Sequence, residues 1–371
     1  MQQHPMFQIA ILGGGLAGLV AAIELGKKYK VLLVEKDPYP RHRVCGEYVS
    51  NEVLPYLQTM GIHPLAEGAI PINQFEISTH SGNLIKTKLP LGGFGMSRYA
   101  LDNLLFKKAT KMAQIKFETC TEIKFKNTHF SIATKESNTY TAHYVIGAFG
   151  KRSAIDKVLE RNFIQKKSSW LAVKAHYNYN FDPNVVALHN FDGGYCGLSK
   201  IEAGAVNACY LTTYKSFKRA KNITEFQQKI MSRNPLLANF FQHAQPLFEN
   251  PLTISQVSFE SKKPIENHIF MIGDAAGLIH PLCGNGMAMA IHSAKLLATV
   301  FFQNDFNNRN LLEKEYAKIW THTFSRRLQS GQWIQKVLLR PALAKASFKI
   351  AKIVPSVLPK IIEKTHGESF V

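Results

Sequence analysis

The feature that most constrains the fold of this chain is a glycine-rich turn between two apolar segments near the N-terminus. Residues 7–12 are apolar apart from Gln8 and lead into the sequence GGGLAG at residues 13–18. An Ala- and Leu-rich stretch follows, and a second apolar run covers residues 31–34. This order predicts a strand, a tight turn, a helix and a second strand, so we expect the first part of the chain to form an α/β unit.

Three glycines in this turn have the spacing of a dinucleotide-binding fingerprint. Gly13 permits the tight turn, Gly15 lets the backbone approach a pyrophosphate, and Gly18 lets the helix pack closely on the strand. The helix N-terminus directs N–H groups at the phosphates. Glu35 ends the second strand, where it can accept hydrogen bonds from an adenosine ribose. We therefore expect a Rossmann-like domain that holds a dinucleotide; a glycine-rich turn in another α/β unit is the alternative.

The segment after Glu35 resembles a flavoprotein superfamily. Residues 40–47 read PRHRVCGE, which is similar to a loop of FAD-dependent monooxygenases, geranylgeranyl reductases and flavin-dependent halogenases that leads toward the flavin ring. The resemblance places Cys45 near the face of the ring, where it is a candidate catalytic residue. Arg41 and Arg43 have the chemistry to meet phosphate or the nucleotide. The alternative for Cys45 is a small cysteine packed in a loop.

Two further segments extend the resemblance. Residues 97–105, SRYALDNLL, resemble the helix start whose arginine, here Arg98, contacts FAD in this superfamily; a solvated arginine is the alternative. Residues 273–287, GDAAGLIHPLCGNGM, resemble the second FAD motif. By that resemblance Asp274 accepts hydrogen bonds from the ribityl chain and Pro281 lies by the ring. The helix that begins near the last glycine would favour negative charge on the reduced flavin. The cofactor residues expected in this motif are Gly273, Asp274, Pro281, Gly284, Gly286 and Met287.

The resemblance covers residues 7–300 and implies an α/β fold like that of the single-FAD-domain, para-hydroxybenzoate-hydroxylase-like flavoproteins. A Rossmann-like FAD-binding domain is interleaved with a β-sheet substrate domain, and a C-terminal helical tail follows. The predicted boundaries are 1–75, 98–160 and 253–310 for the FAD-binding domain, 76–97 and 161–252 for the substrate domain, and 311–371 for the basic amphipathic tail.

The predicted substrate domain has a strand-rich pattern. Strands are expected at residues 169–179, 185–191 and 207–213, and a polar helix near 223–232. In the first of these strands the period of two places Lys174 and His176 on one face. The pair can contact substrate or serve in proton transfer, so both are candidate catalytic residues. Two polar residues on a solvated sheet face are the alternative.

Several departures from the superfamily's patterns bear on the reaction. Phe149 stands where many aromatic hydroxylases carry an aspartate that helps to bind FAD and the nicotinamide donor. No second strand-GxGxxG-helix unit occurs, so an NAD(P)H donor would visit a shared cleft transiently, and the sequence does not identify the donor. Halogenases are disfavoured because no WxWxIP motif is present. The missing Trp and Phe-Pro of the reductases weaken the reductase interpretation.

The formal charge of +19 favours anionic partners. Residues 331–360 contain six basic residues and no acidic one, with three lysines at helical spacing and two prolines that break the stretch into short helices. These are Lys345, Lys349, Lys352, Pro341 and Pro355. The pattern suits an acidic membrane surface, where a lipophilic substrate would be collected. A helix packed on the flavin domain with its lysines outward is the alternative. Nucleic acid is not expected as a partner, because no nucleic-acid-binding module is recognisable.

The sequence also bears on the compartment. Five scattered cysteines without CxxC or Cys/His ligand spacing predict neither a disulfide framework nor a metal site. The N-terminus lacks the pattern of a signal peptide, and no run of eighteen apolar residues occurs. We therefore expect a cytoplasmic protein, with peripheral contact at the inner face of the membrane through residues 331–360.

Taken together, these patterns predict an FAD-dependent oxidoreductase. The leading hypothesis is a monooxygenase that hydroxylates a lipophilic or phenolic small molecule through a flavin C4a-hydroperoxide in a water-poor cleft. The alternative is a geranylgeranyl-reductase-like enzyme that saturates carbon–carbon double bonds, with Cys45 near the ring. A nucleic-acid-binding flavoprotein is suggested by the charge alone. The sequence does not identify the substrate or the oligomeric state.

Overall fold

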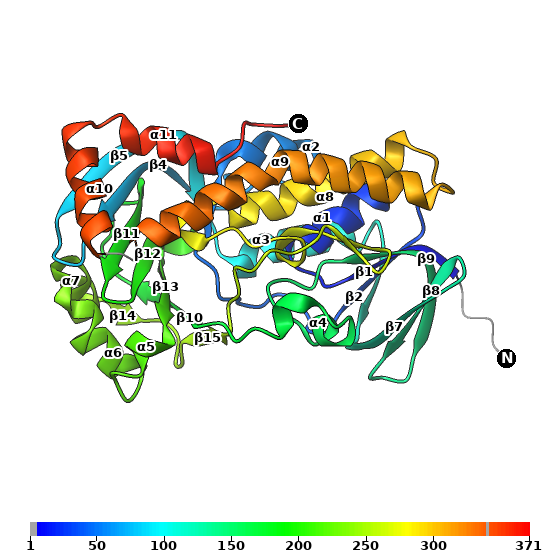
Figure 1. Ribbon diagram of the computed structural model, residues 1–371, viewed down its shortest axis with the longest axis horizontal. Coiled ribbons are helices and arrows are strands. Elements are labelled where there is room, and N and C mark those ends of the chain that lie inside the picture. The colour runs from blue at the N-terminus through cyan, green and yellow to red at the C-terminus, as the bar shows by residue number, and fades with distance from the viewer. Residues whose placement is uncertain (1–5, 339–340) are drawn as a thin grey trace.

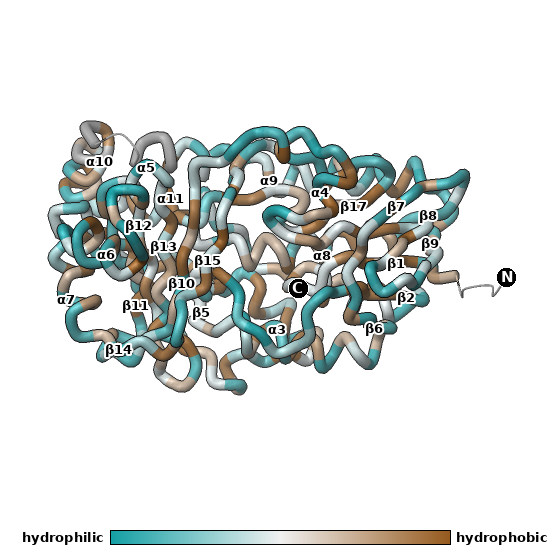
Figure 2. Tube along the Cα trace, turned by 90° about the horizontal axis from the view of Figure 1, so that it is seen from below, coloured by the Kyte–Doolittle hydropathy of each residue, from teal (hydrophilic) through white to brown (hydrophobic). Residues whose placement is uncertain are grey.

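Two β-sheets, one toward each end of the long axis, organise the chain, and helices lie between and around them (Figure 1). The computed structural model describes residues 6–338 and 341–371. Hydrophobic segments follow many of the inner strands and helices, whereas many outer loops are hydrophilic (Figure 2). This distribution indicates that the two sheets carry the main cores.

The first sheet contains both strands that flank the glycine-rich turn. Its strands are β1 (Met6–Leu12), β2 (Val31–Glu35), β6 (Gln114–Phe117), β7 (Cys120–Lys126), β8 (His129–Thr134), β9 (Thr139–Gly147), β16 (Ile265–Glu266) and β17 (Ile269–Met271). The order is β16-β17-β9-β1-β2-β6, and β7 and β8 form a hairpin attached to β9. The strands from β17 to β6 run parallel, and Ile9 pairs with Val31. Apart from Gln8 and the terminal Glu35, β1 and β2 are apolar because a parallel sheet is covered on both faces.

Four helices pack around this sheet and against one another. They are α1 (Leu16–Leu25), α3 (Arg98–Ala109), α8 (Gly286–Gln303) and α9 (Arg309–Leu338). Helix α1 contacts both α3 and α8, and α9 runs along α8 (Figure 1). All residues of α1 are buried, which its almost uniformly apolar sequence allows. The predicted strand-turn-helix-strand unit and the helix start near Gly286 are confirmed.

The second sheet is larger and mostly antiparallel. Its strands are β3 (Tyr48–Ser50), β4 (Ile70–Ser78), β5 (Leu84–Gly95), β10 (Trp170–Asn178), β11 (Val185–Phe191), β12 (Gly194–Lys200), β13 (Val206–Thr213), β14 (Gln245–Pro246) and β15 (Leu252–Ser255). The order is β14-β10-β13-β12-β11-β4-β5-β3, with β15 on β10. The strands predicted at 169–179, 185–191 and 207–213 are confirmed as β10, β11 and β13.

The two faces of the second sheet contact different parts of the chain. Short helices α5 (Tyr214–Phe217), α6 (Ile223–Lys229) and α7 (Pro235–His243) cover one face. There Val173 and Tyr210 of the sheet belong to the same apolar core as Phe226 of α6. The alternate residues of β10, beginning with Trp170, lie on the other face, where they pack with Leu278 of the second glycine-rich motif. This second face therefore meets the predicted cofactor segments.

The sheets divide the chain differently from the predicted domain boundaries in three places. β3 lies at Tyr48–Ser50 and β4 begins at Ile70, both inside the segment 1–75 that was expected to belong to the FAD-binding domain. β15, at Leu252–Ser255, pairs with β10 and so extends the second sheet past residue 252. β3 pairs with β5, β4 with β11 and β15 with β10, and each of these partners lies far away along the chain, so local sequence does not reveal their membership.

The C-terminal region is helical. After α9, α10 (Pro341–Ile353) and α11 (Val357–Thr365) follow, so Pro341 starts one helix and Pro355 lies between two, as predicted. Helix α11 contacts both α9 and β5. Two short helices, α2 (Leu54–Thr59) and α4 (Ala154–Val158), complete the structure. Within residues 6–338 and 341–371, no helix combines the length and hydropathy needed to cross a membrane.

Candidate functional site

The glycine-rich turn has the close contacts that its spacing predicts. A β-carbon at Gly13 would lie 2.5 Å from the carbonyl oxygen of Ala148, and Gly13 has a φ of 105° that favours glycine. A β-carbon at Gly18 would lie 1.9 Å from the carbonyl oxygen of Gly13. Gly15 differs, because its nearest neighbour would be an Arg98 nitrogen at 3.7 Å. Gly13 and Gly18 are thus required by the fold, whereas Gly15 leaves room for a ligand.

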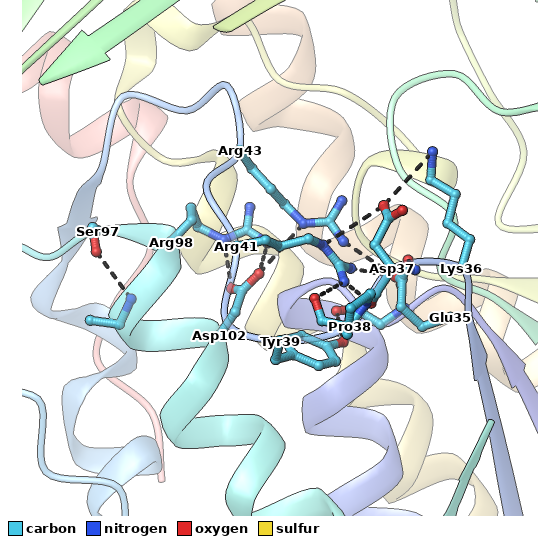
Figure 3. A network of polar contacts seen from close by, with 12 residues as sticks. Glu35, Lys36, Asp37, Pro38, Tyr39, Arg41, Arg43, Ser97, Arg98 and Asp102 are labelled. Carbon is cyan, nitrogen blue, oxygen red and sulfur yellow. Dashed lines mark hydrogen bonds and ion pairs between the residues drawn. The ribbon is translucent and has the colours of Figure 1, made fainter. Parts of the chain in front are cut away.

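Glu35 lies beside this turn, at the end of β2. Its Oε2 atom accepts a hydrogen bond from the backbone N–H of Gly14 at 2.7 Å and lies 2.9 Å from Arg41 Nη2 and 3.2 Å from Arg43 Nη2 (Figure 3). The Arg41 guanidinium also stacks over the ring of Tyr39. The carboxylate therefore joins the turn to the loop that carries the PRHRVCGE sequence. Arg41 and Arg43, the two arginines of this loop, both lie within ion-pair distance of Glu35.

Arg98 is held by Asp102 on the next turn of α3. Arg98 Nε donates to Asp102 Oδ1 at 2.6 Å and Nη2 donates to Oδ2 at 2.7 Å (Figure 3). Burial lowers the pKa of Arg98, but the paired Asp102 outweighs it and the pKa is raised overall. The solvated-arginine alternative is therefore wrong. Asp102 also lies 3.6 Å from Arg43 Nε, so one buried carboxylate orients two arginines beside the turn.

Sequence reasoning missed Asp102 as a site residue. The signal that would have found it is the i, i+4 spacing of Arg98 and Asp102 on a helix, which places the two side chains on one face. An arginine paired in this way is fixed in its orientation, so it can present charge to a phosphate with little loss of side-chain freedom.

The second glycine-rich motif packs directly on the first. A β-carbon at Gly273 would lie 3.0 Å from the Cβ of Ala17 in α1. The carbonyl oxygen of the next residue, Asp274, accepts from Lys262 Nζ at 2.7 Å, and the same ammonium donates to the Lys151 carbonyl at 2.9 Å. Burial lowers the pKa of Lys262 to about 8. Lys262, which sequence reasoning missed, ties the loop after β9 to the second motif.

The remaining predicted residues of this motif lead into α8. Pro281 starts a short 3₁₀ turn that ends at Gly284, which has a φ of 64°. Gly286 is the first residue of α8, and Met287 is buried behind it. The helix N-terminus therefore presents unpaired N–H groups at this loop, as predicted.

The residues present fit FAD, because glycines of several loops face unfilled space. Among the described residues, no atom lies within 4 Å of where a β-carbon would stand at Gly46 or Gly150. At Gly15 and Gly286 the nearest atoms would lie at 3.7 and 3.8 Å. Bare backbone in this arrangement admits a large ligand at van der Waals distance, and Arg43 and the Arg98–Asp102 pair supply charge for its phosphates.

Glu47 is the central acceptor of a buried polar cluster that sequence reasoning missed. Its Oε1 accepts from Lys174 Nζ at 2.6 Å and from the Arg98 backbone N–H at 2.8 Å, and its Oε2 lies 2.7 Å from His176 Nε2. Burial raises the pKa of Glu47, but the hydrogen bond from His176 and the charge of Lys174 outweigh it, so the pKa is lowered. Glu47 belongs to the CGE sequence, but its neighbours in the sequence do not indicate which side chains it contacts.

The cluster shows that the alternative given for Lys174 and His176 of β10, a solvated sheet face, is wrong. Lys174 and His176 do lie on one face, as the period of two predicts, but the face is buried and not solvated. Both side chains bind Glu47, so their observed role is to fix the loop that carries Cys45. Asn207 of the neighbouring strand adds to this by donating to the carbonyl oxygens of Cys45 and Gly46. The part that these residues play in catalysis stays a prediction.

Comparison with known proteins agrees with this geometry. A family model described as FAD binding domain matches residues 6–304. A protein called conditioned medium factor receptor 1, from Dictyostelium discoideum, is 24% identical over 376 residues, which is 90% of this chain and 71% of that protein. Kynurenine 3-monooxygenase of the same organism is 25% identical over 332 residues, covering 79% and 69%. The solved structure of the flavin-dependent brominase Bmp2 superimposes with a TM-score of 0.78 at 17% identity, covering 99% of this chain and 95% of that one.

Proposed function

This chain belongs to the FAD-binding-domain family and is an FAD-dependent oxidoreductase, and we propose that it is a monooxygenase that hydroxylates a lipophilic or phenolic small molecule. When bound, FAD supplies the oxygen-activating chemistry. One atom of O₂ enters the substrate and the other leaves as water, with two electrons from a donor. The similarity to kynurenine 3-monooxygenase supports this reaction class.

The observation that carries the proposal is the contact between the cofactor loops and a buried sheet face. The backbone of Gly46 faces free space, while the neighbouring Glu47 is bound to Lys174 and His176 of β10. A cofactor lying on this loop is therefore next to a buried sheet face. A site that excludes water suits oxygen transfer, because it limits wasteful side reactions of the activated oxygen.

The residues of this chain hold and orient the cofactor. Arg43 and Arg98 are fixed by Asp102 where they can meet phosphates, and Glu35 lies at the end of β2 where the ribose of an adenosine would be bound. The N-terminus of α8, at Gly286, offers N–H groups to negative charge. These groups would orient the cofactor through charge and hydrogen bonds.

We also propose NAD(P)H as a donor that binds transiently in the shared cleft. Only one strand-GxGxxG-helix unit occurs among the described residues, and FAD is assigned to it. Phe149, which packs partly buried against the core, has no carboxylate, so the donor would bind without the contact that an aspartate makes at this position.

A peripheral contact with an acidic membrane surface is proposed for α10. Its exposed residues, together with the residue that follows it, combine apolar and basic side chains and define the α10 patch: Leu343, Ala346, Lys349, Ile350, Lys352, Ile353 and Val354. The side chain of Lys345 lies outside the described residues. Exposed apolar groups flanked by ammonium groups match a surface of anionic lipid, from which a lipophilic substrate would be taken.

Stopped-flow absorbance tests the monooxygenase proposal. The flavin of the purified protein is reduced without oxygen and mixed with oxygenated buffer, with and without a long-chain alkylphenol. We expect a transient species that decays faster with the phenol, and an oxygen atom from ¹⁸O₂ in the product. Direct return to oxidised flavin under both conditions, together with anaerobic saturation of an alkene, would instead establish the reductase.

A further inference from the structure

The face of the second sheet that meets the cofactor loops changes in character along its strands. At one end His176 pairs with Asn207 across β10 and β13, and both bind the loop of residues 45–47. In the middle row Gly197 pairs with Cys209. A β-carbon at Gly197 would meet only backbone oxygens of the sheet itself, at 3.6 and 4.0 Å. No described side chain therefore lies within 4 Å of where a β-carbon of Gly197 would stand.

Tyr195 lies two residues before Gly197 in β12 and on the same face of the sheet. The side chain is buried, and its hydroxyl has no hydrogen-bond partner among the described residues. Burial holds the pKa of Tyr195 well above its ordinary value, so the hydroxyl keeps its proton. A buried hydroxyl without a partner costs free energy, so its retention in an otherwise apolar cluster calls for a ligand or water.

His280, from the second glycine-rich motif, presents another unsatisfied donor at the same place. Its ring lies 6.0 Å from that of Tyr195, 6.2 Å from Trp170 and 4.5 Å from Phe259. Nδ1 accepts a hydrogen bond from the backbone N–H of Leu282. The proton of the neutral imidazole therefore resides on Nε2, which is buried and has no partner within the described part of the chain.

The neutral state of His280 follows from its surroundings. Burial among aromatic rings lowers the pKa of His280 to about 3, and the Tyr195 phenol, which is not a charged group, faces it from the sheet. The Tyr195 hydroxyl, from the sheet, and the His280 Nε2–H, from the second glycine-rich motif, are thus two neutral donors near the sheet at Gly197. A ligand oxygen that accepts hydrogen bonds is the chemical group that matches both donors.

We propose that His280 Nε2–H and Tyr195 O–H recognise an acceptor oxygen, a phenolate or an aryl carbonyl, on a planar aromatic substrate that lies over Gly197. This inference rests on the proposed function, since it names the substrate class of the same site. Trp170 and Phe259 supply the aromatic wall for such a ring. Both donors would help to stabilise negative charge on the bound oxygen.

The experiment measures binding to the FAD-loaded protein, with 4-nitrophenol and acetophenone as probes of the phenolate and the carbonyl. We expect the bound nitrophenol to ionise at a pH about one unit or more below that of the free probe. Tyr195→Phe and His280→Asn should each weaken binding roughly tenfold or more. Asn at position 280 keeps an acceptor for the Leu282 N–H while removing the Nε2–H donor.

Tyr210→Phe is the matched control, because Tyr210 is also a buried tyrosine whose hydroxyl has no partner among the described residues, but it belongs to the core on the opposite face. It should bind both probes as the unmodified protein does. Flavin content and thermal unfolding show whether each variant is folded. If neither probe binds the unmodified protein, or if both variants bind as tightly as the control, the recognition site is overturned. Failure of the monooxygenase proposal is seen separately, in the oxygen kinetics without a probe.

Discussion

Glu47 Oε1 accepts a hydrogen bond from the Lys174 ammonium group at 2.6 Å, and both side chains are fully buried. The pair connects the residue before β3, at one edge of the second sheet, with β10, near the other edge. The loop of residues 45–47 therefore crosses the face of the sheet. Since the Arg98 N–H also donates to Glu47, this carboxylate joins the sheet to the start of α3 as well.

Removing the charge of Glu47 should destabilise the protein strongly. Glu47→Gln leaves the Lys174 ammonium buried without an anion, and we expect a loss of about 3–5 kcal/mol in the free energy of unfolding. Urea denaturation measures it. Glu76→Gln, which breaks a pair with the exposed Lys86, should cost no more than about 1 kcal/mol. Equal losses in the two variants would show that the buried pair has no special role.

The stabilising effect of Glu47 should disappear in acid. The folded-state pKa of Glu47 lies below its ordinary value of 4.5, because His176 and Lys174 outweigh the effect of burial. The folded protein therefore keeps this group ionised where the unfolded chain binds a proton. The contribution is fully present above pH 4.5 and is lost as pH falls through the folded-state pKa. The difference in stability between the unmodified protein and Glu47→Gln, measured at several pH values, should shrink over that range.

Lys262 should produce a dependence on pH of the same sign as Glu47, but in the alkaline range. Burial lowers its pKa to about 8, from an ordinary 10.5. Between these values the unfolded chain binds the proton that the folded protein has lost, so the free energy of unfolding rises with pH, by at most about 3 kcal/mol. Lys262→Met should lack this rise from pH 8 to 10.5. Lys263→Met, which changes an exposed neighbour, should retain it.

Two glycine substitutions should separate folding from cofactor binding. Gly15→Val places its side chain toward free space, so we expect a folded protein that no longer retains FAD and is colourless when purified. Gly13→Val forces a β-carbon within 2.5 Å of a backbone oxygen at a positive φ, so it should fail to fold. Circular dichroism and the flavin absorbance distinguish the outcomes. A yellow Gly15→Val protein would count against the FAD assignment.

The α10 patch should bind vesicles that contain anionic lipid. Lys349→Glu with Lys352→Glu replaces attraction by repulsion, and because each basic residue near such a surface contributes about 1 kcal/mol, binding should fall roughly tenfold or more. Co-sedimentation with phosphatidylserine-containing and neutral vesicles measures it. Lys124→Glu, on β7 toward the other end of the molecule, is the control (Figure 1). Binding that is independent of lipid charge and of salt would contradict an electrostatic contact.

Several elements of the site were predictable because they depend on neighbours along the chain. The turn at residues 13–18 is set by the close approach of Gly13 to Gly18, and Glu35 follows at the end of the next strand. The start of α8 at Gly286 and the helix breaks at Pro341 and Pro355 have the same local origin. The orientation of Lys174 and His176 follows from the two-residue period of a strand.

The dinucleotide-binding unit and the FAD-dependent class were predictable from the sequence, since both follow from local spacing and from motifs that require particular backbone shapes. The contacts of the polar side chains, in contrast, depend on long-range packing. Lys174 is separated from Glu47 by 127 positions, and their contact exists because the loop folds across a sheet that buries both. Tyr195 and His280 likewise meet only when the second sheet packs on the motif loop. Long-range packing removes water from these groups. Once buried, a charge needs an ion-pair partner, and a donor without a protein partner can bind a ligand.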